Sequence, residues 1–240
     1  IVWFIVRSEK MLEKMNWLYL SLDLTTLFFP LALSFDKNVR YYKAWKNSIL
    51  AAVIISVPFL IWDYLFTYHG FWGFNPDYIT GINVFHLPIE EILFFIVVPF
   101  ACTFIYEVSK YLFRGYSQNI LNKLIYFLIP LYGVVLVVID ANGYYTLAVL
   151  LSSGAVLVLM ILNAELKYLS LAFLLSLIPF LMINGVLTGT FIDNSVVWYS
   201  EAQKVQARIL TIPMEDILYS FTLVVSNMIL FEKLQQKSAK

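Results

Sequence analysis

The sequence predicts an all-α, polytopic membrane protein with about seven transmembrane helices. It is 61% hydrophobic and 13% charged, whereas soluble domains contain about 45–50% apolar and about 25% charged residues. Apolar stretches of about the ~20 residues that a helix needs to cross a bilayer recur along the whole chain. We expect the helices over residues 17–35, 47–66, 88–106, 121–139, 145–162, 168–187 and 213–232.

Local signals justify the boundaries of these helices in order. A segment with four Lys or Arg residues separates the first helix from the second. We place the start of the third helix at Pro88. Proline is common at the first position of a helix, because its missing N–H would have no hydrogen-bond partner there. The polar turn over residues 140–143 separates the fourth helix from the fifth. The seventh helix opens at Pro213 in the same way as the third.

Two pairs of matching segments indicate an internal repeat. The motifs Pro88-Ile-Glu-Glu91 and Pro213-Met-Glu-Asp216 each open an apolar run and begin 125 residues apart. Residues 58–63, near the end of the second helix, match residues 179–184 of the sixth at an offset of 121. A loop that is four residues longer in the second copy reconciles the two offsets. The sequence therefore predicts two three-helix repeats.

The predicted repeats are parallel. Residues 17–107 form the first repeat, residues 145–234 the second, and residues 108–144 a linker with the fourth helix. One extra crossing restores the starting side, so both repeats have the same orientation. Both acidic motifs are then expected at one membrane face, and the repeat-related pair Glu107 and Glu232 at the other. The remaining residues are expected to form tails, 1–16 and 235–240, and the first of these need not be native sequence.

The distribution of basic residues predicts the orientation of this multi-pass protein in the cell membrane. Lys and Arg number four between the first two helices, three over residues 107–123 after the third and three at the C-terminus, whereas the 67–87 loop has none and the 188–212 loop has two. The positive-inside rule then predicts a cytoplasmic C-terminus and an external N-terminus. Arg7, Lys10 and Lys14 argue the other way.

Several classes of function are disfavoured by composition. A net charge of zero and the lack of any Lys/Arg block argue against nucleic-acid binding. Cys102, His69 and His86 are too few to form a Cys/His metal site. The sequence also has no Gly-x-Gly-x-x-Gly fingerprint for a flavin or nicotinamide. We therefore expect no cofactor and no metal.

The paired acids suggest proton chemistry. Neighbours on a helix point about 100° apart, so one acid of each motif can face the interior of the bundle. A carboxyl group in an apolar cavity can hold a proton and act as a general acid. Alternatively, the acids simply start helices at the water interface, where the helix dipole favours them. Their occurrence at repeat-related positions favours chemistry.

The aromatic content fits an apolar substrate that becomes cationic. The chain contains 20 Phe, 16 Tyr and 6 Trp residues. Aromatic walls stabilise cations by roughly 0.5–2 kcal/mol per contact. We expect most of these residues to serve in packing and interfacial belts, with a minority lining a cavity.

The two acidic motifs, the loop over residues 72–81 and the two-repeat layout resemble the membrane-integral lycopene cyclase family, over roughly residues 16–234. The resemblance implies an isomerase of the lycopene β-cyclase type. Such an enzyme converts the ψ end groups of lycopene to β-ionone rings, giving γ-carotene and β-carotene, without net oxidation. It also implies a hydrophobic carotenoid substrate within the lipid bilayer. The catalytic acids that it implies are Glu90, Glu91, Glu215 and Asp216.

Within the two motifs, Glu90 and Glu215 are the leading candidates for proton donor and acceptor, because both copies carry Glu at this position. Their individual roles stay open. Asp63 and Asn184 are repeat-related polar residues that either orient the acids or cap helix ends.

Four further polar residues near the motifs have two interpretations each. Asn75 and Asp77 form a turn or help to close the site. Arg208 is an interfacial anchor or pairs with Asp216. His86 is a proton relay or an incidental interfacial residue.

Other classes of membrane protein require residues that this sequence can be searched for. A retinal protein needs a lysine in the middle of the seventh helix, and residues 213–232 contain none. A prenyltransferase needs DxxxD-type spacing for magnesium pyrophosphate, which no pair of Asp residues provides. A related membrane cyclase that acts on another isoprenoid stays open. A proton-coupled transporter or carrier also stays open, because such proteins use paired intramembrane acids.

Overall fold

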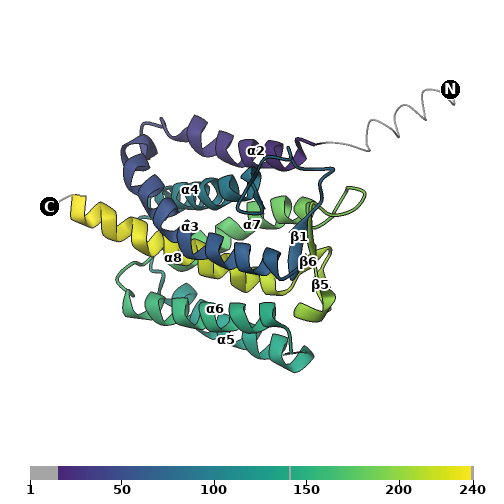
Figure 1. Ribbon diagram of the computed structural model, residues 1–240. Helices are drawn as coiled ribbons and strands as arrows, with labels where there is room; N and C mark the ends of the chain where they lie inside the picture. Colours follow the sequence, from purple (N-terminus) through teal and green to yellow (C-terminus); the bar gives the residue numbers. More distant parts are fainter. Residues whose placement is uncertain (1–15, 141, 239–240) are drawn as a thin grey trace, which may run out of the picture.

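The computed structural model describes residues 16–140 and 142–238, which fold into a bundle of seven α-helices (Figure 1). All seven expected helices are confirmed, and the ends of the third and seventh lie six residues further along the chain than expected. Most of the predicted tails, residues 1–15 and 239–240, lies outside the described residues. The helices are α2 (Leu18–Leu33), α3 (Trp45–Tyr68), α4 (Ile89–Leu112), α5 (Asn119–Ile139), α6 (Tyr144–Leu162), α7 (Leu169–Leu187) and α8 (Glu215–Ser238).

The helices have the dimensions of membrane spans. Six of the described helices are long and apolar enough to cross a bilayer. The other, α2, has 16 residues and is about 24 Å long at ~1.5 Å per residue, somewhat less than the ~30 Å of a hydrocarbon core. The chain is a multi-pass membrane protein.

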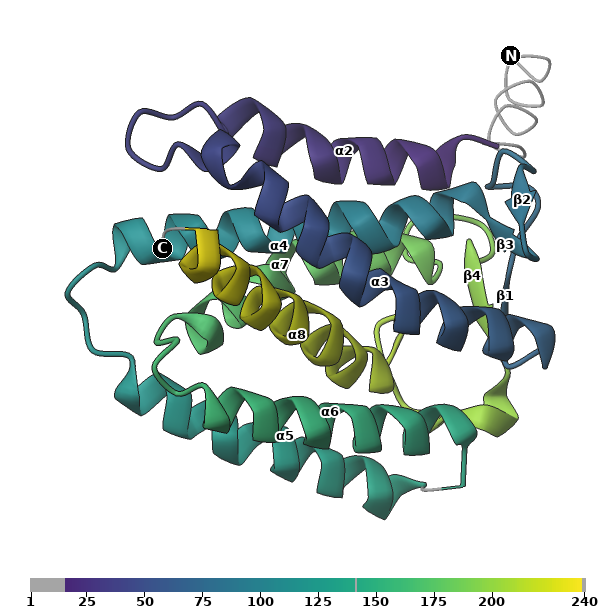
Figure 2. The same cartoon turned by 60° about the vertical axis from the view of Figure 1, so that its left-hand side comes forward.

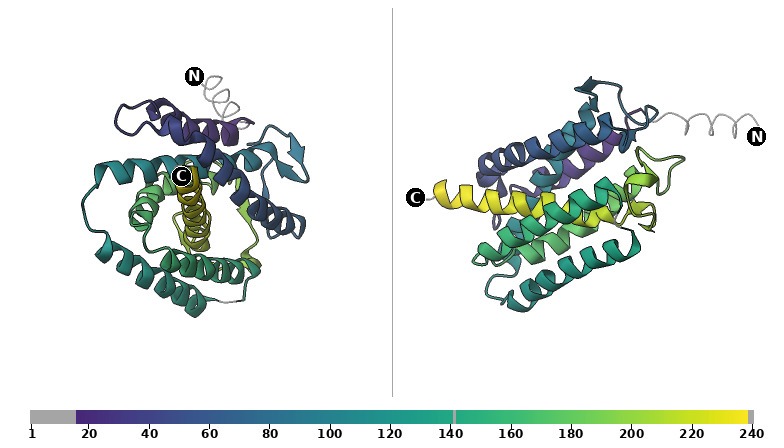
Figure 3. Two further views of the ribbon diagram at one scale, coloured as in Figure 1. Left: turned by 90° about the vertical axis from the view of Figure 1, so that its left-hand side faces the viewer. Right: turned by 60° about the horizontal axis from the view of Figure 1, so that its bottom comes forward.

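Helix α8 lies at the centre of the bundle. In its most apolar window 61% of the residues are buried, against 22% for α5. The view along the bundle shows α8 surrounded by the other helices (Figure 3, left). The buried Asn227 of α8 donates a hydrogen bond to the carbonyl of Pro99 in α4, at 3.2 Å. Because α8 is central, the acids in its first turn lie in the interior of the protein.

The loops at one end of the bundle contain short paired β-strands (Figures 1 and 2). Strand β1 pairs antiparallel with β4, and Gly73 lies opposite Trp198. A Cβ at residue 73 would overlap the Trp198 ring, which explains the glycine. The strands are β1 (Trp72–Phe74), β2 (Asn83–Val84), β3 (Leu87–Pro88), β4 (Val197–Tyr199), β5 (Arg208–Ile209) and β6 (Ile212–Pro213), and two 3₁₀ helices are η1 (Tyr41–Ala44) and η2 (Glu201–Gln203).

The β1–β4 pair joins the loop after α3 to the loop after α7. Strands β2 and β3 form a hairpin before α4, and β5 and β6 form one before α8. Asn83 pairs with Pro88, and Arg208 pairs with Pro213, so the two hairpins are offset by 125 residues. Each hairpin leads directly into one acidic motif, and the β1–β4 pair holds the two loops together at one end of the bundle. The expected convergence of both acidic motifs on one end of the bundle is therefore confirmed.

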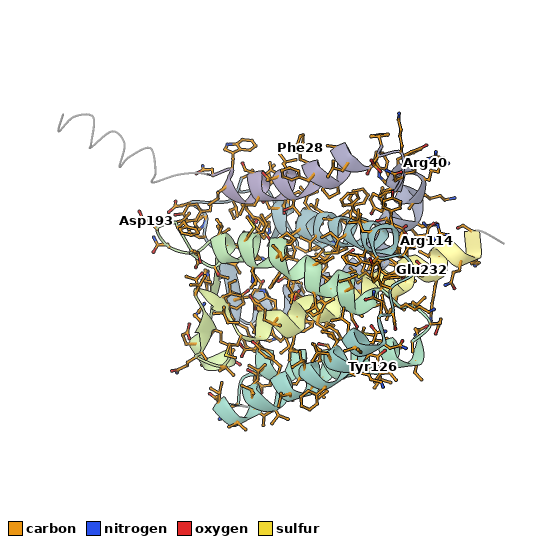
Figure 4. All side chains as sticks on the ribbon, turned by 180° about the vertical axis from the view of Figure 1, so that it is seen from behind. Phe28, Arg40, Arg114, Tyr126, Asp193 and Glu232 are labelled. Carbon is orange, nitrogen blue, oxygen red and sulfur yellow. The ribbon has the colours of Figure 1, made fainter. Side chains whose placement is uncertain are left out.

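The other end of the bundle carries the second repeat-related acid pair. Lys110 forms salt bridges with both Glu107, at 2.7 Å, and Glu232, at 2.8 Å. Figure 4 labels Glu232 at this end and Asp193, from a loop, at the opposite one. These matching contacts support the repeats, whose boundaries stay a prediction.

Candidate active site

A pocket lies between the two halves of the chain at the loop end of the bundle. Its unoccupied space is about 480 Å³, including the part that opens outward. Aromatic side chains make up much of its wall, and the polar lining includes Asp63, Glu91, Asn184 and Asp216. The pocket therefore combines carboxyl groups from α3, α4 and α8 with an apolar surround.

Glu91 enters the pocket from the first turn of α4. The hydroxyl of Tyr19 in α2 donates a hydrogen bond to Glu91 Oε2 at 2.5 Å. Asp63 of α3 lines the same pocket as Glu91. The indole N–H of Trp72 donates to Asp63 Oδ1 at 2.5 Å, while Asp63 Oδ2 is buried with no hydrogen-bond partner among the described residues.

Asp216 enters the pocket from the first turn of α8 and accepts three hydrogen bonds. The hydroxyl of Tyr145 in α6 donates to Oδ1 at 2.6 Å. The amide of Asn184 donates to Oδ2 at 2.7 Å, and the hydroxyl of Tyr199 donates to the same oxygen at 3.2 Å. All three donors are uncharged, and together they favour the ionised form of the carboxyl.

The two tyrosines are repeat equivalents that the sequence analysis missed. Tyr19 and Tyr145 are 126 residues apart, and the acids that they contact, Glu91 and Asp216, are 125 apart. Each tyrosine lies in the first turn of the first helix of its half. A search for repeat-related aromatic residues near both offsets would have found the pair.

The first acid of each motif has a different environment from the second. Glu90 Oε1 accepts a hydrogen bond from the backbone N–H of Thr80 at 2.7 Å, and Glu215 Oε1 accepts one from that of Val205 at 2.5 Å. Thr80 and Val205 are themselves 125 residues apart. Thr146 adds a hydroxyl donor to Glu215 at 2.7 Å. Both glutamates are fully buried, and each holds the loop that precedes its helix.

This geometry does not support our preference for Glu90 and Glu215. Because successive residues point about 100° apart on a helix, only one acid of each pair faces the pocket, and that acid is Glu91 or Asp216. The geometry favours these second acids for chemistry.

The supporting residues divide into two groups. Asn184 donates a hydrogen bond to Asp216 and so can orient it, whereas Asp63 lines the pocket and is bonded to Trp72 and not to one of the motif acids. Asn75 accepts a hydrogen bond from the backbone N–H of Asp77 at 3.0 Å, which is the turn interpretation. His86 is exposed at the tip of the β2–β3 hairpin, outside the pocket lining.

Arg208 does not form the pairing with Asp216 that we considered. Its guanidinium binds Glu201 at 2.7 Å and the carbonyl of Thr211 at 2.6 Å. Arg208 lies in β5 and is not part of the pocket lining, whereas neutral donors surround Asp216. Glu201 also pairs with the buried Lys204 at 2.6 Å, and these two cations lower the pKa of Glu201.

Four aromatic rings form a cage beside the acids. The centroid of the Trp72 ring is 5.2 Å from that of Tyr145, 6.0 Å from Tyr199 and 6.4 Å from Tyr219. Burial, followed by the charge of Asp216, raises the pKa of Tyr199 well above its usual value. The phenol of Tyr199 therefore stays protonated and remains a donor. Such a cage can stabilise a cation by cation–π interaction.

Comparisons with known proteins bear on the identity of this site. No curated protein and no solved structure gives a significant match to the chain. The model of one protein family, described as lycopene cyclase, matches residues 16–109 and 142–234. Each matched region contains one acid pair and most of a three-helix unit, and together they cover more than half of the chain. The chain therefore belongs to the lycopene cyclase family, and with its acid pocket and membrane helices it is an enzyme that cyclises a hydrophobic carotenoid substrate.

Proposed function

We propose that the chain is a lycopene β-cyclase, which converts the ψ end groups of lycopene to β-ionone rings. The terminal double bond takes up a proton at its less substituted carbon, which leaves a tertiary cation. An internal double bond attacks this cation, closes a six-membered ring and moves the charge to a second tertiary carbon. Loss of a neighbouring proton restores a double bond and completes the β ring.

Glu91 is the proton donor in this proposal. It shares a pocket with the buried Asp63, and two carboxyl groups in one apolar site cannot easily both be ionised. One proton therefore stays on the pair. Tyr19 orients Glu91 from the side. A protonated carboxyl in an apolar pocket meets the requirement for a general acid that protonates a carbon–carbon double bond.

Asp216 is the proton acceptor. Its three hydrogen bonds from Tyr145, Asn184 and Tyr199 favour its carboxylate form. A fixed negative charge near the ring cation stabilises the intermediate before the proton is removed. Trp72 and the neighbouring tyrosines add cation–π stabilisation of roughly 0.5–2 kcal/mol per contact.

The reaction as written is an isomerisation. One proton enters the end group and another leaves it, so no electrons are exchanged with a partner. The enzyme class is thus an isomerase of the intramolecular lyase type, and the chemistry requires only groups that exchange protons. Glu91, Asp63 and Asp216 supply these groups in the pocket.

One observation carries the proposal: the second acids of the two motifs enter a single aromatic pocket from opposite halves of the chain. The test is to express the chain in a bacterium that accumulates lycopene and to separate the pigments by chromatography. We expect γ-carotene and β-carotene to appear. Unchanged lycopene with well-expressed protein would contradict the substrate, and rings with the double bond in another position would contradict the β assignment.

A further inference from the structure

We propose that a groove between α4 and α7, with α8 as its floor, binds the polyene arm of the substrate while the end group lies in the acid pocket. This inference rests on the proposed function for the identity of the occupant. The groove holds about 640 Å³ of unoccupied space, including the part that opens outward. Figure 4 views the bundle from behind, where α4 and α7 run next to each other below α2.

The groove adjoins the acid pocket. Phe94, Phe180, Asn184 and Tyr219 line both spaces. From these shared residues the groove runs along α4 at least to Ile105, away from the loop end. A substrate with a reactive end and a long arm fits two adjoining spaces of this kind.

The lining suits a hydrocarbon that has no polar atoms. Two of the three Ser and Thr hydroxyls on the groove wall are bonded within their own helices: Thr26 Oγ1 donates to the carbonyl of Leu22 at 2.8 Å, and Ser220 Oγ donates to that of Ile217 at 2.9 Å. The third, Ser176 Oγ, is buried with no hydrogen-bond partner among the described residues. Thr26 and Ser220 therefore present mainly carbon to the groove. A polyene can lie against them without breaking either hydrogen bond.

The groove has an open side and a closed floor. Pro179 at its edge is exposed on the surface of α7, which faces the lipid in a membrane-spanning bundle. Leu223 and Val224 of α8 are buried beneath it. A carotenoid dissolved in the bilayer can therefore enter sideways, without passing through water.

The corresponding space in the other half is filled by aromatic rings. At the repeat offsets of 125 and 121, Phe95 stands where the groove has Ser220, and Trp62 stands where it has Ile183. Phe95 is fully buried, and the Phe59 ring lies 6.0 Å from Phe95 and 5.9 Å from Trp62. Two small-for-large exchanges therefore account for a groove on the α7 side.

A single groove can hold the polyene arm of only one substrate molecule in one direction. A lycopene molecule with its arm in this groove presents a single end group to Glu91 and Asp216. The second end can react only after the molecule has left and entered again the other way round. Monocyclic product should therefore be released before bicyclic product forms.

The proposal is tested with a substitution that narrows the groove at a point far from the acids. Ala101 lines the groove ten residues after Glu91 on α4, about 15 Å away at ~1.5 Å per residue. Wild type and Ala101→Phe are incubated with lycopene in detergent micelles and purified, and the bound carotenoid per protein is measured by absorbance. We expect at least a ~10-fold weaker affinity for lycopene in the variant, a loss of about 1.4 kcal/mol.

A matched variant and a milder one guard against misfolding. Ala155→Phe makes the same change at an exposed position of α6 and should bind lycopene like wild type. Ala101→Leu adds less volume and should give an intermediate loss, with thermal unfolding used to confirm that all three variants are folded. If folded Ala101→Phe binds lycopene with the affinity of the wild type, the groove does not bind the polyene arm. Failure of the wild type to bind lycopene would also overturn the proposal. Because the bound carotenoid is counted whether or not it has been cyclised, a wild type that binds lycopene but does not cyclise it would contradict only the proposed function.

Discussion

Asp63 and Asn184 occupy equivalent positions 121 residues apart and face the same pocket, but they act in opposite senses. Asp63 accepts a hydrogen bond from Trp72, whereas Asn184 donates one to Asp216. This single difference breaks the chemical symmetry of the repeats. One half contributes two neighbouring carboxyl groups, which suit a proton donor, and the other contributes one carboxylate surrounded by donors, which suits an acceptor.

The donor and acceptor assignment predicts a large loss of activity in Glu91→Gln and in Asp216→Asn. Each amide keeps the shape of the acid but cannot give or take the proton. General acid–base groups contribute roughly 10²–10⁴-fold to rate, and we expect losses at the upper end. Product is quantified by chromatography with expression matched by immunoblot. Glu107→Gln, at the opposite end of the bundle, is the control and should stay near wild type.

The two first acids should tolerate the same exchange far better. Glu90→Gln and Glu215→Gln keep an oxygen that accepts the loop N–H of Thr80 or Val205, so we expect less than a ~10-fold loss of activity, well below the effect of removing a general acid or base. Alanine at either position removes the acceptor and should lower the melting temperature. A loss as large as that of Glu91→Gln would return the catalytic role to the first acids.

Isotope labelling follows the proton directly. Cyclisation in D₂O should place one deuterium in each new ring, because Glu91 exchanges with solvent before it protonates the double bond. Mass spectrometry of the product counts the label. Rings without deuterium would mean that the proton comes from the substrate itself, and Glu91 would lose its assigned role.

Membrane orientation is tested by labelling of single cysteines. In a Cys102→Ser background, Ile82→Cys and Asp193→Cys lie in exposed loops at the pocket end, and Lys37→Cys lies in the loop between α2 and α3. We expect the first two to react with an impermeant maleimide from outside the cell, and the third only after permeabilisation. Labelling of all the loop-end sites from inside would reverse the orientation and leave the shared pocket intact. Labelling of the first two from opposite sides would contradict the fold.

Much of the fold could be read from one-dimensional features. The length of each apolar run sets the number of helices, since a span needs about 20 apolar residues. The offset of 125 between the acid motifs, together with an odd linker helix, implies that both motifs lie at one end. The pairing of β1 with β4, which joins the two loops at that end, was not predicted from the sequence.

Which acid faces the pocket was decided only by the tertiary structure. Adjacent residues on a helix differ by about 100° in direction, so the choice between Glu90 and Glu91 depends on how α4 is rotated against its neighbours. That rotation is set by packing against α2, α3, α7 and α8. No local pattern in the motif records it.

The sequence by itself determined a seven-helix membrane fold, an internal repeat and two acid pairs, because hydrophobic length and repeat spacing are properties of the chain. Tertiary structure alone decided that Tyr19 and Tyr145 bind the second acids, that Glu90 and Glu215 hold loops, and that a groove opens beside α7. The physical reason is distance along the chain: Tyr19 and Glu91 are 72 residues apart. Only the packing of the whole bundle brings such groups within hydrogen-bond reach.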